Sequence, residues 1–297
     1  MNKVLQRLLT FFIGIPVVVG IICLSYLNHL LLNVVLVLCS VLMTIELHNL
    51  FSVNIKMPNL IFTSILSASL PIVSYLTILF CPQNADNFTH WTFIILCLIL
   101  MVYEVFAHKT FEESNKRLSA SIFEIFYCGF LITFITRMSL FENSTIVISL
   151  FLVTIFMNDS IAWFFGMLFG KNNRGFVAVS PNKSIVGFIG GYLGAILVCI
   201  LASYLFPEIM NAQNQTMSII KAVILGFVTA TAGIVGDLTE SVFKRSANKK
   251  DSGTIIPGRG GLLDSCDSIV FAAPIFYIVF TLLYNPSLIT TVQNLAK

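Results

Sequence analysis

Six of the fourteen acidic residues in this sequence lie after residue 157 in three short clusters. Each cluster sits in a segment that also carries Gly, Lys or Ser. Carboxylates hold divalent cations in proteins, and lysines bind phosphate as positive charges. These clusters could therefore bind a metal ion and a phosphate together. Their members are Asp159, then Asp237 with Glu240, then Asp251, Asp264 and Asp267.

The second cluster falls on one side of an apolar helix. At about 100° per residue, Asp237, Glu240, Ser241 and Lys244 share a single arc. An acid in a membrane-spanning helix is costly unless it meets a cation, a metal ion or water. We therefore expect this face to line a hydrophilic cavity. A structural ion pair is the less favoured alternative for the two acids.

Basic residues continue this pattern at the end of the same helix. Lys244 and Arg245 are followed by Lys249 and Lys250. The alternative to phosphate binding is that they anchor the helix end at the cytoplasmic surface, where positive charge is usual. For Lys249 and Lys250 the two interpretations stay equally open.

A glycine-rich loop comes next. Residues 253–264 contain four glycines and are bounded by Asp251 and Asp264. Glycine allows backbone amides to approach an anion closely. Composition alone also fits a plain turn before the last helix, but the flanking acids and bases favour a phosphate site.

Membrane helices must position these residues. The chain is 57% apolar and 10% charged, with a mean hydropathy of +0.92, which is typical of a membrane protein. A span needs roughly 20 apolar residues. We predict an all-α polytopic membrane protein that forms one unit, with a scaffold of about five helices in 1–143 and a catalytic region in 144–297. The nine expected spans lie near 9–26, 29–46, 58–80, 89–107, 120–138, 144–169, 184–206, 217–241 and 267–285.

The positive charges predict the orientation of these spans, because short cytoplasmic loops carry an excess of Lys and Arg. Fourteen fall on one side and three on the other, which predicts a cytoplasmic N-terminus and a C-terminus outside. No small-residue cleavage site follows the first span, so we expect it to stay as an anchor and not to be a signal peptide. The three on the outside are Arg137, Lys221 and Lys297.

Cysteine and histidine usage excludes several chemistries. The seven cysteines are scattered and lie almost entirely in apolar stretches, as small core residues do. The four histidines lie in the first 110 residues, away from the acidic clusters, so neither zinc chemistry nor Ser-His-Asp catalysis is expected. With a net charge of +3 and no basic stripe with interleaved aromatics, nucleic acid is not expected as a partner.

Four glycines in the expected seventh span follow small-xxx-small spacing. They are Gly187, Gly190, Gly191 and Gly194. This spacing favours close helix packing over ligand contact. The packing partner could be another helix of the chain or a second copy in a homodimer.

Two stretches combine these features in a fixed order. One contains GDLTES at 236–241, KR at 244–245, KDSG at 250–253 and PGRGGLLDSCDS at 257–268. The other contains NDSIAW at 158–163, FGK at 169–171 and SPNKS at 180–184. Together they resemble the phosphatidate cytidylyltransferase family over residues 158–268. The N-terminal half is similar only in being apolar and helical.

Three positions depart from the pattern of that family. Arg259 stands where a His is usual, Ser265 where an Arg follows the loop Asp, and Val186 where a Glu is common. Arg259 keeps a hydrogen-bond donor beside the glycines but cannot shuttle a proton near neutral pH. A diverged member with slower or altered chemistry is therefore one alternative.

The resemblance implies transfer of a cytidylyl group from CTP to phosphatidate, giving CDP-diacylglycerol and pyrophosphate for phospholipid synthesis. It implies Mg²⁺, alone or with a second metal ion, held by Asp237 and Asp264. The catalytic residues would be Asp237, Asp264, Lys244, Arg245 and Asp267. The substrate and phosphate would be bound by Asp159, Ser180, Lys183, Glu240, Ser241, Lys250, Asp251, Arg259, Gly260 and Gly261.

The two substrates also indicate where the site lies. CTP is cytoplasmic and phosphatidate lies in the lipid leaflet, so we expect the site at the cytoplasmic face, and the short loops favour a bacterial inner membrane. The nearest alternative is a related CTP-dependent enzyme acting on another lipid, such as a polyprenol kinase. Less favoured are an ion-coupled transporter that uses the intramembrane acids and a catalytically inactive member of the family.

Overall fold

The computed structural model describes residues 14, 16–107, 109–210, 215–256 and 260–285. Within these ranges the chain is helical, and two isolated bridges, Arg174 to Ser184 and Ile256 to Gly260, are the β-type pairings. The helices are α2 (Tyr26–Phe51), α3 (Leu60–Phe80), η1 (Pro82–Asn84), α4 (Ala85–Ala107), α5 (Ser114–Glu124), η2 (Ile125–Phe130), α6 (Thr133–Arg137), η3 (Met138–Leu140), α7 (Ser144–Phe169), α8 (Ile185–Leu205), α9 (Gln215–Ser246) and α10 (Leu263–Tyr284).

The all-α polytopic prediction is confirmed. Eight helical segments in the described ranges are long and apolar enough to cross a membrane, with η1 and α4 forming one of them and 114–140 another. Of the expected first span, 9–26, residues 9–13 and 15 lie outside the described residues, and 16–23 are helical. α9 continues past the expected end at 241, and α10 begins before 267. Hydropathy missed these turns because they carry charged residues.

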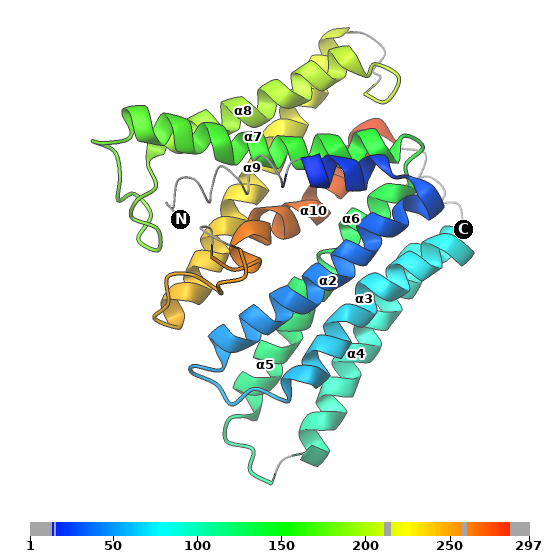
Figure 1. Ribbon diagram of the computed structural model, residues 1–297, viewed down its shortest axis with the longest axis vertical. Coiled ribbons are helices and arrows are strands. Elements are labelled where there is room, and N and C mark those ends of the chain that lie inside the picture. The colour runs from blue at the N-terminus through cyan, green and yellow to red at the C-terminus, as the bar shows by residue number, and fades with distance from the viewer. Residues whose placement is uncertain (1–13, 15, 108, 211–214, 257–259, 286–297) are drawn as a thin grey trace.

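The helices form two groups that meet at α9 and α10 (Figure 1). α2, α3, α4 and α5 run roughly parallel in one group, and α7 and α8 lie side by side in the other. The close packing of α7 on α8 depends on the glycines of α8. A Cβ at Gly190 would lie 2.8 Å from the Phe165 Cβ, and one at Gly194 would lie 2.9 Å from the Met157 carbonyl oxygen. These glycines therefore serve a helix interface within the chain.

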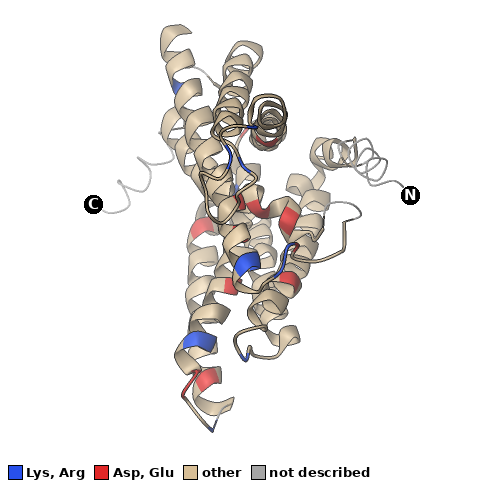
Figure 2. Ribbon diagram, turned by 90° about the vertical axis from the view of Figure 1, so that its left-hand side faces the viewer, with Lys and Arg blue, Asp and Glu red and all other residues tan. Residues whose placement is uncertain are grey.

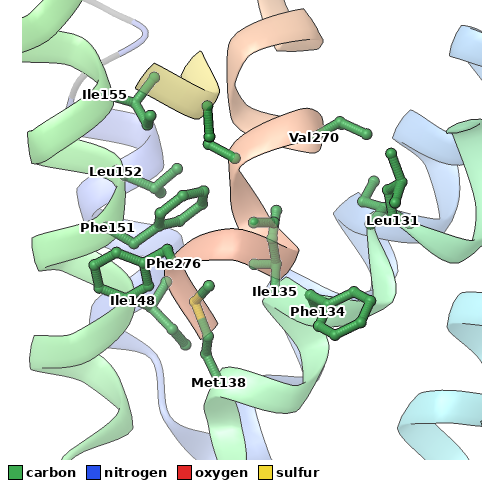
Figure 3. Close-up of a cluster of buried hydrophobic side chains, with 14 of the residues drawn as sticks. Leu131, Phe134, Ile135, Met138, Ile148, Phe151, Leu152, Ile155, Val270 and Phe276 are labelled. Carbon is green, nitrogen blue, oxygen red and sulfur yellow. The ribbon is translucent and has the colours of Figure 1, made fainter. Parts of the chain in front are cut away.

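A buried apolar cluster fixes α10 against the first group (Figure 3). Residues 131–138 contribute Leu131, Phe134, Ile135 and Met138, which face Val270 and Phe276 of α10. α7 adds a second layer on the other side of α10. Its members are Ile148, Phe151, Leu152 and Ile155. In lipid, such van der Waals packing is a main source of helix association, so α10 has a defined place.

Most of the charged residues lie in the middle and lower parts of the ribbon in Figure 2. At one end of the bundle, the Asn54 side-chain amide donates to the Ser246 carbonyl oxygen at 2.8 Å, which joins the loop after α2 to the end of α9. At the other end of the bundle, Arg137 lies 3.2 Å from Asp86 and 4.4 Å from the Phe134 ring. Loops expected on opposite sides of the membrane thus lie at different ends. Which end faces the cytoplasm stays a prediction.

Candidate active site

The end of α9 carries a buried charge cluster. Lys244 forms an ion pair with Glu240, one turn earlier, and donates to Asp264 Oδ1 at 2.6 Å. The three side chains are 12%, 0% and 7% exposed, respectively. One ammonium group therefore lies between two buried carboxylates. Of the four residues on the expected polar face of α9, Glu240 and Lys244 meet the start of α10, and Asp237 is the one that lines the cavity described below.

Asp264 organises the glycine-rich loop. Its Oδ2 accepts hydrogen bonds from the Ser252 backbone N–H at 2.8 Å, the Ser252 hydroxyl at 2.9 Å and the Gly261 N–H at 2.8 Å. Gly260 has a φ of +110°, which disfavours other residues, and a Cβ there would lie 2.6 Å from Asp264 Oδ2. Glycine is thus required where the loop wraps around this carboxylate.

A third carboxylate reaches the loop from α2, and the sequence analysis did not select it. Glu46 is 3% exposed and accepts from the Leu262 N–H at 2.9 Å, the Leu263 N–H at 2.8 Å and the Ser252 hydroxyl at 2.8 Å. Helix N-termini leave unpaired N–H groups that favour negative charge, so Glu46 caps α10. The signal available was an acid inside an apolar stretch, but it stands far in sequence from the three clusters.

A cavity of about 450 Å³ opens beside this cluster, between α7, α8 and α9. Lys183, from the loop before α8, forms an ion pair with Asp237 of α9 in its wall. Burial lowers the pKa of Lys183, and the carboxylates of Asp159 and Asp267 act in the opposite direction. The lysine is therefore half-buried, pairs with Asp237 of α9 and lies in the field of acids on α7 and α10. Such an ammonium group is suited to a phosphate.

The remaining wall of the cavity is mixed in character. Asp159 is exposed, and its Oδ1 accepts from the Asn158 amide at 3.0 Å. Trp163 is 65% exposed and, with Met167, provides an apolar side to the opening. Arg174 adds a second cation. A ligand with a charged head and an apolar tail would match this lining.

Several predicted site residues occupy other positions. Ser241 and Asp267 are buried near the cluster, and the Asp267 Oδ1 accepts from the Ser268 N–H at 2.6 Å. Arg245 is exposed and donates to the Lys249 carbonyl oxygen at 3.0 Å. Of the others, Lys250 and Asp251 are exposed, Ser180 is half-buried in the loop before α8, and Arg259 lies outside the described residues.

Comparison with known proteins shows the family of the chain. A sequence model of the cytidylyltransferase family matches residues 5–283. The chain belongs to this family. It is 32% identical over 206 residues to a phosphatidate cytidylyltransferase of Staphylococcus saprophyticus, covering 68% of this chain and 75% of the relative. It is 30% identical over 186 residues to the Aquifex aeolicus protein of the same name, covering 63% and 65%.

The metal site expected of this cytidylyltransferase can be compared with the donor set. Among the described residues, no group of three or more His, Cys, Asp or Glu side chains forms a cage for an ion. Mg²⁺ commonly uses one or two carboxylates together with substrate phosphates and water, so such a cage is not required. Asp237 fits, because its carboxylate lies on the cavity wall and already holds a cation, Lys183. Of the two carboxylate oxygens of Asp264, Oδ1 has fewer hydrogen-bond partners, and it accepts from the Lys244 ammonium group.

Proposed function

We propose that this cytidylyltransferase transfers the cytidylyl group of CTP to phosphatidate. A phosphate oxygen of phosphatidate attacks the α-phosphorus of CTP, the bond from that phosphorus to the bridging oxygen breaks, and pyrophosphate leaves. The products are CDP-diacylglycerol and pyrophosphate. The observation that carries the proposal is the Lys183–Asp237 ion pair on the wall of a cavity with one charged and one apolar side.

The residues of the site suit the demands of this reaction. Transfer between phosphates depends mainly on positioning and on neutralising charge. Lys183 would exchange its partner Asp237 for a substrate phosphate, and Arg174 could contact a second phosphate. Asp237, freed from the lysine, would then hold Mg²⁺ together with the substrate phosphates. When bound, that ion would offset the negative charge of the two substrates.

The second charge cluster would support the first. Lys244 pairs with the buried carboxylates of Glu240 and Asp264 and holds the two side chains together beside the cavity. Asp264 in turn fixes the backbone of the glycine-rich loop.

The proposed setting is the inner membrane of a bacterium, with the site open to the cytoplasm. The curated relatives are bacterial, and the bias of Lys and Arg puts the site loops inside. The exposed indole of Trp163 beside the cavity would let a lipid headgroup enter from the leaflet. A homodimer stays a prediction.

The test is pyrophosphate release by the purified protein in detergent micelles. We expect release that requires CTP, phosphatidate and Mg²⁺ together, and that Asp237→Asn abolishes. Glu208→Gln, an exposed acid in the loop after α8, is the matched control and should retain activity. Formation of CDP with a polyprenol, and no pyrophosphate release with phosphatidate, would instead establish the related lipid kinase and refute the proposal.

A further inference from the structure

Glu46 makes an unusual set of long-range contacts for a residue of the apolar first half. Its three hydrogen-bond donors come from residues 252, 262 and 263, more than 200 positions later. Two of the donors are backbone N–H groups at the start of α10, and the third is the Ser252 hydroxyl. α2 therefore holds both ends of the glycine-rich loop.

The loop is shaped to admit this carboxylate. A Cβ on Gly253 would lie 2.5 Å from Glu46 Oε1, and a Cβ on Gly261 would collide with Glu46 Oε2. Any side chain at either position would have to push Glu46 or the loop backbone aside. Two of the four loop glycines are thus explained by contact with an acid of α2, which differs from the phosphate role expected from the sequence.

One hydroxyl connects Glu46 to Asp264. The Ser252 hydroxyl lies 2.8 Å from Glu46 Oε2 and 2.9 Å from Asp264 Oδ2. A serine hydroxyl has a single proton to donate, so the two carboxylates share it. Because backbone N–H groups complete the shells of both acids, displacement of one acid would shift the loop around the other.

We propose that Glu46 is a positioning residue for cytidylyl transfer: it fixes the loop at 252–263 and, through Ser252, the place of Asp264 beside Lys244. This inference rests on the function proposed above. Glu46 does not line the cavity, so it acts through the loop and touches no substrate.

The decisive variant is Glu46→Gln, which keeps the size of the side chain and replaces one acceptor oxygen by a donor. That NH₂ group would face donors of the loop. We expect kcat to fall by about tenfold or more, while KM for phosphatidate stays within about threefold of wild type. The matched control is Glu124→Gln, a buried acid that contacts His48 of α2 and not the loop; its kcat per folded molecule should be unchanged.

Limited trypsin digestion tests the loop without reference to catalysis. Lys249, Lys250 and Arg259 lie in or beside it, and we expect faster cleavage there in Glu46→Gln than in Glu124→Gln or wild type. If wild type shows no transfer to phosphatidate, the proposed function fails, and the digestion still reports whether Glu46 holds the loop.

Ser252→Ala provides a milder variant should Glu46→Gln not fold. We expect it to lower kcat by about threefold to tenfold, and the double variant to be no worse than Glu46→Gln alone, because both changes break one linkage. Wild-type kcat in Ser252→Ala, or a Glu46→Gln protein that only melts earlier and turns over normally, would overturn the positioning role.

Discussion

Replacing Lys244 by methionine should separate the stability of the charge cluster from its catalytic use. Lys244 is the ammonium group between Glu240 and Asp264, and all three side chains are largely buried. Without it, two carboxylates remain in a poorly solvated site. Breaking a buried pair on one side costs about 3–5 kcal/mol, and we expect the lower end because one acid can take up a proton.

The activity of Lys244→Met should fall by more than the smaller folded fraction of the variant would explain. A preorganised positive charge or donor in an active site is worth about 10²–10³ in kcat, so we expect Lys244→Met to lose about that much pyrophosphate release. Adding Glu240→Gln removes one of the two carboxylates that have lost their cation, and it should reverse most of the decrease in melting temperature. It should not recover kcat, because the cation is still missing.

The control is Lys221→Met on the same helix. Lys221 lies near the other end of α9, where its ammonium group donates to the Leu283 carbonyl oxygen at 2.7 Å. Pyrophosphate release per folded molecule should match wild type. A catalytic role of Lys244 is refuted if Lys244→Met keeps kcat within about threefold of wild type, or if adding Glu240→Gln restores turnover.

Other changes should give equally distinct results. Chelation with EDTA should stop pyrophosphate release, and added Mg²⁺ should restore it. Turnover that continues in EDTA would show that the reaction needs no divalent ion. Gly191→Ala would place a Cβ 2.7 Å from Asn158 Oδ1, so we expect kcat/KM to fall about tenfold. The control is Gly20→Ala, where the new Cβ has open space around it, and kcat/KM should not change. Arg137→Met, at the other end of the bundle, should leave turnover per folded molecule unchanged; a large loss would show coupling between the two ends.

Hydropathy and charge predicted most of the fold because lipid imposes a simple rule on helix length and composition. They failed at helix ends. The charged turns of α9 beyond residue 241 and of α10 before residue 267 are helical because their acids and lysines neutralise one another across the two helices. Such mutual neutralisation cannot be seen in a hydropathy window over one helix.

The candidate site was predictable where spacing within one helix decides it. Glu240 and Lys244 pair as the 100° rule requires. The partner of Asp237 was not predictable in this way, because Lys183 lies in a loop 54 positions earlier. Glu46 was overlooked for the same reason: its contacts depend on how α2 packs beside α10. The roles assigned to the site residues stay predictions.

The balance of charge supports a cation supplied from outside the chain. Within the described part of the site there are six acidic side chains, those of Glu46, Asp159, Asp237, Glu240, Asp264 and Asp267, and three basic ones, those of Lys183, Lys244 and Arg174. Backbone N–H groups donate to Glu46, Asp264 and Asp267, whereas Asp237 and Glu240 pair with the two lysines. Both substrates bring further negative charge to a site of low dielectric, where like charges repel strongly. When Lys183 turns from Asp237 to a substrate phosphate, that carboxylate needs another cation. A divalent ion that arrives with the nucleotide phosphates meets both needs at once.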